Sequence, residues 1–92
     1  MSITRFPLGQ IVATPGALDA LDAAGNNPLA YIRRHVAGDW GDVELEDANE
    51  NEYSVVRFLR ILSSYHLDDG TRLWIITEAD RSATTLLLPE EY

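Results

Sequence analysis

The chain has 92 residues, of which 46% are hydrophobic and none is cysteine, and its formal net charge is −8. This length suffices for one small hydrophobic core but not for two, so we expect a single compact domain over residues 1–92. The lack of cysteine excludes disulfides, thiolate metal sites and a cysteine nucleophile. Together with the lack of an apolar run of signal-peptide or membrane-spanning length, it is typical of a cytoplasmic protein.

The negative charge comes from a large excess of acidic over basic residues. Fifteen acidic residues face seven arginines, and there is no lysine. A small body with this charge repels nucleic-acid phosphates at long range, and the only close basic pairs are Arg33-Arg34 and Arg57 with Arg60. We therefore expect no direct nucleic-acid binding and no membrane binding, and instead a partner protein with a basic surface.

Two helices are expected in the first half of the chain, after a short strand at 9–13. Each begins with a capping residue followed by proline at the first helical position, as Thr14-Pro15 and Asn27-Pro28. Each ends at a glycine, Gly25 or Gly38. The apolar residues expected to face the core are Ala17, Leu18, Leu21, Ala24, Leu29, Ile32 and Val36.

The segment 39–52 is strongly acidic and holds no basic residue. Its weak apolar pattern is compatible with a short third helix that has little to bury, or with an exposed loop. Trp40 is the exception, because a tryptophan here either plugs the helices onto the sheet or stands exposed as an anchor for a partner. The acidic residues of the segment are Asp39, Asp42, Glu44, Glu46, Asp47, Glu50 and Glu52.

From Arg60 onward the apolar residues alternate with a period of two, which predicts strands. Asp69-Gly70 is a strong signal for a hairpin with a two-residue turn. That turn would place Tyr65 directly opposite Trp74, and we expect both rings to be buried beneath the helices. A further strand is expected at 84–88.

The order of these elements predicts an α+β fold. We expect an antiparallel β-meander of about three to four strands packed against two to three short N-terminal helices. No linker, repeat or low-complexity tract divides the chain. A domain this small gains stability from a docked partner or a second copy, so a homodimer remains open.

The sequence contains no recognisable catalytic motif. The nearest approach to an acid–base group is His66 with Glu78, Arg81 and Thr84, although the expected hairpin separates Glu78 from His66 along its length. His35 falls in the last turn of the second helix, where the helix dipole favours a positive imidazole. Neither histidine belongs to a metal-ligand pattern, so we expect no metal and no cofactor.

Three segments carry a family resemblance: FPLGQIVATPGALDAL at 6–21, GDWGD at 38–42 and SSYHLDDGTRLWIITEADRSATTLLLPEEY at 63–92. They resemble a family of small proteins encoded by plasmids, integrative elements and phages. Its members are labelled plasmid-related or hypothetical, and some are labelled type I restriction endonuclease subunit M. The resemblance implies an accessory protein of a mobile genetic element and transfers no site residue.

The leading hypothesis is a non-enzymatic interaction protein, in which the acidic residues of 39–52 supply charge and Trp40 an apolar anchor. Such a protein could inhibit a host defence nucleoprotein complex, as anti-restriction and anti-CRISPR proteins do, by occupying its basic nucleic-acid channel. The partner would be a host or element-encoded protein. The alternatives are a small ribonuclease-like enzyme or toxin built on His66, Glu78, Arg81 and Thr84, or a structural or regulatory homodimer.

Overall fold

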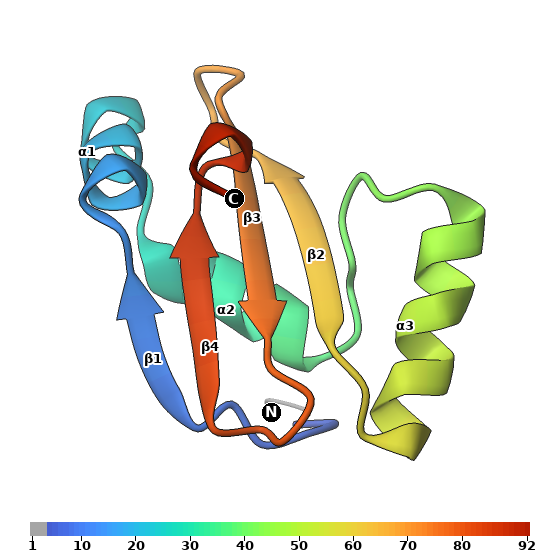
Figure 1. The fold of residues 1–92 in the computed structure, drawn as a ribbon. Coiled ribbons are helices and arrows are strands. Elements are labelled where there is room, and N and C mark those ends of the chain that lie inside the picture. The colour runs from blue at the N-terminus through green and yellow to red at the C-terminus, as the bar shows by residue number, and fades with distance from the viewer. Residues whose placement is uncertain (1–3) are drawn as a thin grey trace.

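The computed structural model describes residues 4–92 and has an α+β fold, as the sequence predicts (Figure 1). Three helices are present in this range: α1 (Pro15–Ala24), α2 (Pro28–Val36) and α3 (Leu45–Arg57). The strands are β1 (Gln10–Ala13), β2 (Ile61–His66), β3 (Arg72–Thr77) and β4 (Ala83–Leu87), and a 3-10 turn, η1 (Pro89–Glu91), follows. In the part of the chain that the structure describes, no helix is both long and apolar enough to cross a membrane.

The four strands form one mixed sheet in the order β1-β4-β3-β2. Strands β2, β3 and β4 make the expected antiparallel meander. Strand β1 joins this meander in parallel to β4, with Gln10 beside Ala83 and Ala13 beside Leu86. The first and last strands of the chain are therefore neighbours (Figure 1).

The ends of the first two helices follow from local sequence. The Thr14 hydroxyl accepts a hydrogen bond from the Ala17 N–H at 3.1 Å, and the Asn27 side chain accepts one from the Leu29 N–H at 3.0 Å. Gly25 ends α1 in the left-handed conformation at φ 70°, which glycine adopts without the steric cost of a side chain. The predicted starts of both helices and the predicted end of α1 are thus confirmed, whereas the C-cap of α2 is Ala37, one residue before Gly38.

Helices α1 and α2 pack on one face of the sheet and enclose the main core. Its buried residues are Ala17, Leu21, Tyr31, Ile32, Tyr65, Leu67, Leu73, Ile75 and Leu86. The set of apolar helix residues predicted to face the core was too large, because Leu18 and Leu29 are about half exposed. Only Ala17 and Leu21, spaced i and i+4, are buried in α1, so this short helix presents a narrow apolar face to the sheet.

The predicted register of the β2–β3 hairpin is wrong by one residue. The Leu67 N–H donates to the Thr71 carbonyl at 2.8 Å and the Gly70 N–H donates to the Leu67 carbonyl at 2.9 Å, so the loop has three residues and not two. Gly70 takes the left-handed conformation at φ 89°.

One extra loop residue shifts the pairing, so that Tyr65 faces Leu73 and Ser64 faces Trp74. Because side chains alternate along a strand, Tyr65 is buried beneath the helices while Trp74 lies half-buried on the opposite face. The expectation that both rings share the core is therefore wrong for Trp74. In the view of Figure 1 this second face is turned toward the reader; no α-helix covers it, and η1 lies over its upper end, where Tyr92 packs edge-on against Trp74.

Helix α3 lies along the free edge of β2, and it is longer than the sequence suggests. The Asn51 side chain acts like a strand residue, because its amide donates to the Leu62 carbonyl at 2.7 Å and its oxygen accepts from the Leu62 N–H at 3.2 Å. Farther along β2, the Ser64 N–H donates to the Trp40 carbonyl and the Asp42 N–H donates to the Ser64 carbonyl. These bonds satisfy the edge of β2 and fix α3 against the sheet.

Candidate protein-interaction site

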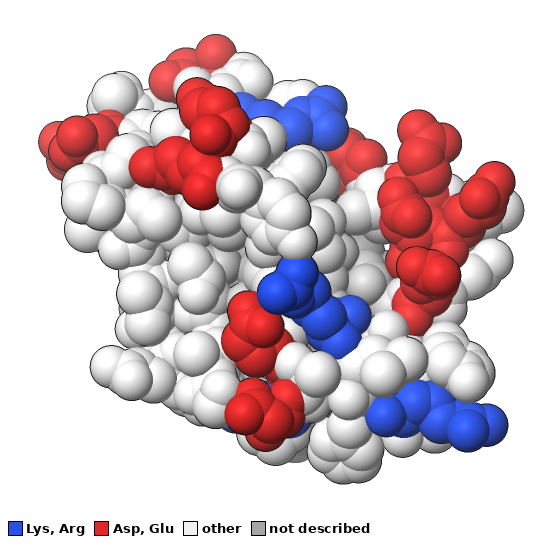
Figure 2. All heavy atoms as spheres, viewed as in Figure 1, with Lys and Arg blue, Asp and Glu red and all other residues white. Residues whose placement is uncertain are grey.

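The N-terminal half of α3 is a strongly acidic surface. Glu44 is the N-cap residue, Glu46 and Asp47 occupy the first turn, and Glu50 follows one turn later. Negative side chains suit this position because the N-terminus of a helix carries a partial positive charge. All four are exposed, and Figure 2 shows acidic side chains gathered over α3 beside the sheet.

The predicted acidic segment divides into a paired group and an unpaired group. Asp39 bonds Arg34 at 2.7 Å, Asp42 bonds His66 at 2.6 Å and Glu52 bonds Arg5 at 2.7 Å. The Arg34 guanidinium lowers the pKa of Asp39, and the Arg5 guanidinium lowers that of Glu52. Within residues 4–92 no salt bridge includes the remaining members Glu44, Glu46, Asp47 and Glu50.

Trp40 is buried, with 6% of its surface exposed, and so does not present its ring to a partner. It stacks on Phe6 at 6.2 Å between ring centres, and its indole N–H donates to Glu52 at 3.0 Å. The sequence left two roles open for Trp40, and the structure shows the first of them: its ring is packed between the helical layer and the sheet. The anchor role needs an exposed side chain.

Sequence reasoning missed a group of exposed apolar residues beside the acidic ones. Leu45, Tyr53 and Val56 are 55–76% exposed and lie on the outward side of α3, and Phe58 and Leu59 follow directly after the helix. The helical spacing of positions 45, 53 and 56 is the signal that could have revealed them. Exposed apolar groups next to charge are typical of protein-interaction surfaces.

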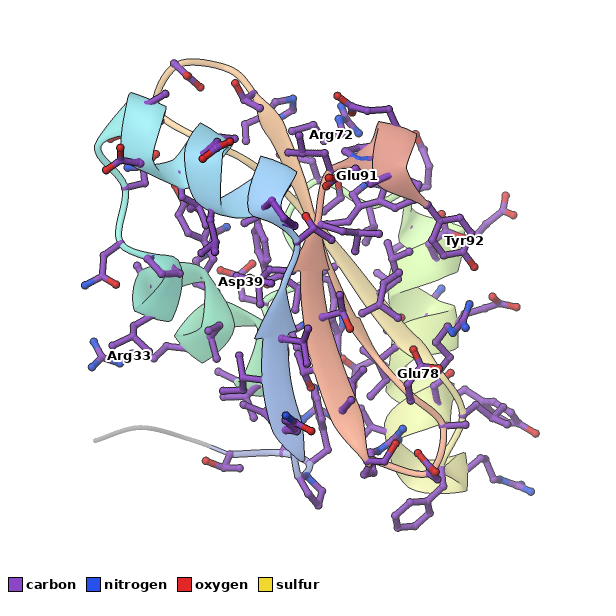
Figure 3. All side chains as sticks on the ribbon, turned by 60° about the vertical axis from the view of Figure 1, so that its left-hand side comes forward. Arg33, Asp39, Arg72, Glu78, Glu91 and Tyr92 are labelled. Carbon is purple, nitrogen blue, oxygen red and sulfur yellow. The ribbon has the colours of Figure 1, made fainter. Side chains whose placement is uncertain are left out.

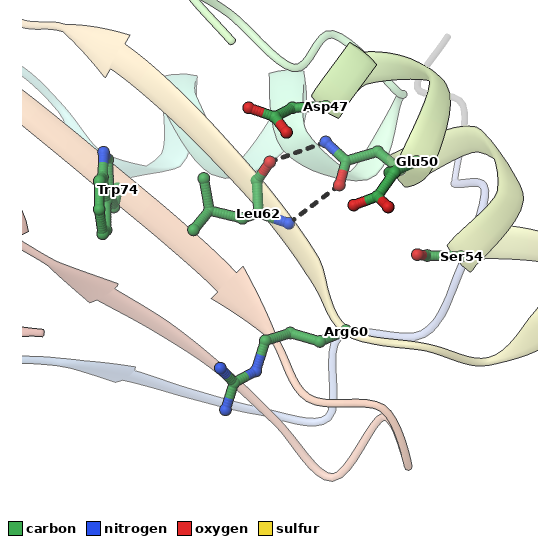
Figure 4. A pocket seen from close by; sticks show the side chains of 7 residues that line it. Asp47, Glu50, Ser54, Arg60, Leu62 and Trp74 are labelled. Atoms are coloured by element: carbon green, nitrogen blue, oxygen red, sulfur yellow. Dashed lines mark hydrogen bonds between the residues drawn. The ribbon is translucent and has the colours of Figure 1, made fainter. Parts of the chain in front are cut away.

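A groove separates α3 from the open face of the sheet (Figure 4). Its volume is about 300 Å³. It is lined by Asp47, Glu50, Asn51 and Ser54 of α3, and by Arg60, Leu62 and Trp74 of the sheet side. The acidic half of α3 therefore forms one wall of a concave surface, which the sequence did not predict.

The structure does not bring the four alternative enzymatic residues together. Glu78 follows the end of β3 and His66 ends β2 at the other end of the hairpin. Figure 3 shows the same separation between Glu78 and Arg72, the cross-strand partner of His66. Thr84 and Arg81 are both buried, and Thr84 donates to the Leu8 carbonyl at 2.7 Å.

Arg81 instead has a structural role. Its guanidinium donates to the carbonyls of Ser54, Leu59, Glu78 and Ala79 at 2.7–3.3 Å, and so joins the end of α3 to the β3–β4 loop. Burial lowers the pKa of Arg81. Its Nε is buried without a hydrogen-bond partner among residues 4–92. Surrounded by carbonyls, this side chain is not available to bind an anion from solution.

His66 belongs to a small polar cluster on the open face of the sheet. Its Nδ1 bonds Asp42, while Arg72 donates to its Nε2 at 3.3 Å and to the Ser64 hydroxyl at 3.4 Å. The Arg72 bond requires a neutral imidazole with the proton on Nδ1. Since Arg72 occupies Nε2, the imidazole has no free nitrogen for a general-base reaction.

His35 is fully buried in a polar chain between α2 and the sheet. Its Nδ1 lies 2.5 Å from the Ser63 hydroxyl and its Nε2 lies 2.9 Å from the Thr77 hydroxyl, which in turn contacts Thr84 at 2.8 Å. Phe6 and Trp40 pack edge-on against the imidazole ring. Burial lowers the pKa of His35 to about 3. This network holds the neutral ring in place and is closed to substrates.

We expect His35 to make the fold sensitive to mild acid. The unfolded chain binds a proton at His35 with a pKa of about 6.5, whereas the folded protein binds it only near pH 3, so protonation favours unfolding throughout this window. At pH 5 the loss in the free energy of unfolding from this residue should be about 2 kcal/mol relative to pH 7.5. Urea denaturation at both pH values measures it.

The matched variants for this prediction are His35→Gln and His66→Gln. Removing the buried ring should reduce the difference in unfolding free energy between pH 7.5 and pH 5 by about 2 kcal/mol, and His66→Gln measures separately how much the other histidine contributes. An unchanged pH dependence in His35→Gln would contradict the assignment.

Comparison of the chain with protein-family models, with curated proteins and with solved structures gives no match.

Proposed function

We propose that this protein is a non-enzymatic interaction protein that binds a partner with a basic surface through the N-terminal half of α3. One observation carries the proposal: Glu44, Glu46, Asp47 and Glu50 are exposed and enter no salt bridge within residues 4–92, whereas Asp39 and Glu52 are paired with arginines and Asp42 is hydrogen-bonded to His66. Unpaired carboxylates keep their full charge for a partner, and no internal ion pair must break on binding.

The attachment of α3 to the rest of the fold supports the same function. Asn51 ties the middle of the helix to Leu62, and Arg81 holds its C-terminal carbonyls. Carboxylates on a fixed helix lose less conformational freedom on binding than those on a disordered tail. Neighbours at i and i+3 or i+4 also lie about 5–6 Å apart, so a helix offers a closely spaced row of negative charges.

The form of this function that we favour is nucleic-acid mimicry. A basic channel that holds nucleic acid in a host defence complex offers the required complementary surface, and α3 would occupy it. The resemblance to plasmid, integrative-element and phage proteins supports this choice, because anti-restriction and anti-CRISPR proteins serve such elements. The net charge of −8 would accelerate association and make it dependent on salt.

A pair of charge-matched variants tests the proposal. Glu46→Gln, Asp47→Asn and Glu50→Gln together remove three charges from α3, and Asp19→Asn, Asp22→Asn and Glu90→Gln remove three exposed charges elsewhere. We expect the α3 variant to bind a partner captured from a bacterial host about tenfold more weakly at low salt, and the control variant to bind nearly normally. Affinity against salt concentration is the measurement.

The complex with the captured partner should also be sensitive to added nucleic acid. Under the mimicry proposal, DNA or RNA added to the complex displaces the protein from its partner, because both occupy one basic surface. Equal losses in the two triple variants would show that only net charge matters. A partner that binds the protein and nucleic acid at the same time would refute mimicry and leave the docking surface intact.

A further inference from the structure

The groove between α3 and the open face of the sheet has walls of different chemistry. Asp47, Glu50 and Ser54 form the α3 side, whereas Leu62 and Trp74 form the sheet side. Its volume of about 300 Å³ is many times the roughly 30 Å³ that one water molecule occupies. The groove therefore has room for a whole side chain and is too large for a single bare ion.

The charge of the groove is negative. Asp47 and Glu50 are spaced i and i+3 on α3, so their carboxylates are neighbours, and neither forms a salt bridge within residues 4–92. The basic lining residue Arg60 is already paired with Glu78 at 3.3 Å and donates to the Tyr92 hydroxyl at 2.6 Å. The groove thus attracts cations.

The side chain of Ser54 lines the same groove. Ser54 has only 6% of its surface exposed, and its backbone carbonyl accepts a hydrogen bond from Arg81. Figure 4 shows the Ser54 side chain pointing from α3 toward the sheet. The neighbouring Asn51 is satisfied by Leu62. A serine hydroxyl both donates and accepts hydrogen bonds, so Ser54 adds a polar group to the lining of the groove.

We propose that this groove binds a guanidinium group, supplied by an arginine side chain of the partner. That the guanidinium belongs to a partner protein depends on the proposed function, whereas the binding of a guanidinium depends only on the residues that line the groove. A guanidinium is planar and can stack on the indole of Trp74 while it donates paired hydrogen bonds to Glu50 or Asp47. Its remaining N–H groups can reach Ser54. A lysine ammonium is not planar and cannot donate two parallel hydrogen bonds to one carboxylate.

The test is a titration of the folded protein with N-acetylarginine methylamide, followed by the two tryptophan indole N–H signals in NMR spectra. We expect the Trp74 signal to shift with a dissociation constant on the order of 1 mM and the signal of buried Trp40 to stay in place. The lysine analogue should bind at least about threefold more weakly. Equal shifts of both indoles, or equal affinity for the two analogues, would overturn the proposal.

Two glutamates of α3 give the matched variants. Glu50→Gln should weaken arginine binding about fivefold, whereas Glu46→Gln, which removes the same charge from outside the groove, should change it less than about twofold. Ser54→Ala should also weaken it measurably. Equal effects of the two glutamate variants would mean that only the general field attracts the probe, which overturns the site.

The titration separates this proposal from the proposed function. Arginine binding without any captured partner would support the groove and count against the interaction function. A captured partner whose affinity is the same for wild type, Glu50→Gln and Ser54→Ala would support the function and overturn the groove as its arginine site.

Discussion

Replacement of Gly41 by alanine is expected to destabilise the fold by about 2–5 kcal/mol. Gly41 has a φ of 74°, a conformation that costs a residue with a side chain about 1–2 kcal/mol. A Cβ at this position would also overlap the Ser64 carbonyl and lie 2.6 Å from the Tyr65 ring. Such overpacking typically costs a further 1–3 kcal/mol. Urea unfolding of the wild type and the variant measures the difference.

Gly25→Ala is the matched control, because Gly25 has a similar φ of 70° but no atom within 4 Å of an added Cβ. It should cost only about 1–2 kcal/mol, the conformational part of the penalty. If the two substitutions cost the same, the close contact between residue 41 and β2 does not exist in solution. The segment 38–42 would then not pack against the sheet as the structure places it.

Replacement of Arg81 by methionine is expected to cost about 3–5 kcal/mol. Methionine keeps most of the length of the aliphatic stem but removes the guanidinium, so the carbonyls of Ser54, Leu59, Glu78 and Ala79 lose a donor. Buried acceptors left without a partner cost about 1–3 kcal/mol each, and part of this is recovered because a buried charge is removed as well. The unfolding free energy is again the measurement.

Arg57→Met controls for the loss of one arginine. Arg57 is exposed and stacks over the Tyr53 ring at 5.1 Å, an interaction worth about 0.5–1 kcal/mol at the surface. Arg81→Lys should recover little of the loss, because one ammonium cannot reach carbonyls on both α3 and the β3–β4 loop. A stable Arg81→Met protein would contradict the structural role of this side chain.

Local signals predicted the helices because the forces that start and end them are local. The pairs Thr14-Pro15 and Asn27-Pro28 fix both helix starts through one side-chain hydrogen bond and one restrained φ each. The hairpin was different, since the same Asp-Gly pair serves two-residue and three-residue loops. Long-range contacts decide between them, including the bond from the Tyr65 hydroxyl to the Asp39 carbonyl at 2.6 Å.

The candidate site was predicted in its composition but not in its geometry. The acidic residues can be read from the sequence. The arginines that form salt bridges with Asp39 and Glu52, and so neutralise these two carboxylates, cannot. Arg5 lies 47 positions from Glu52 and meets it only through the tertiary fold. The groove needs the observed register as well, because a shift of one residue would turn Trp74 away from it.

The parallel pairing of β1 with β4 has a consequence for synthesis on the ribosome. Strand β4 lies in the interior of the sheet, between β1 and β3, and its residues 83–87 are synthesised long after those of β1. At roughly 5–20 residues per second the chain therefore spends several seconds with Ile11 and the rest of β1 unable to pair. Native structure should appear only after residue 87 leaves the exit tunnel, so nascent chains stalled before β4 should remain sensitive to protease.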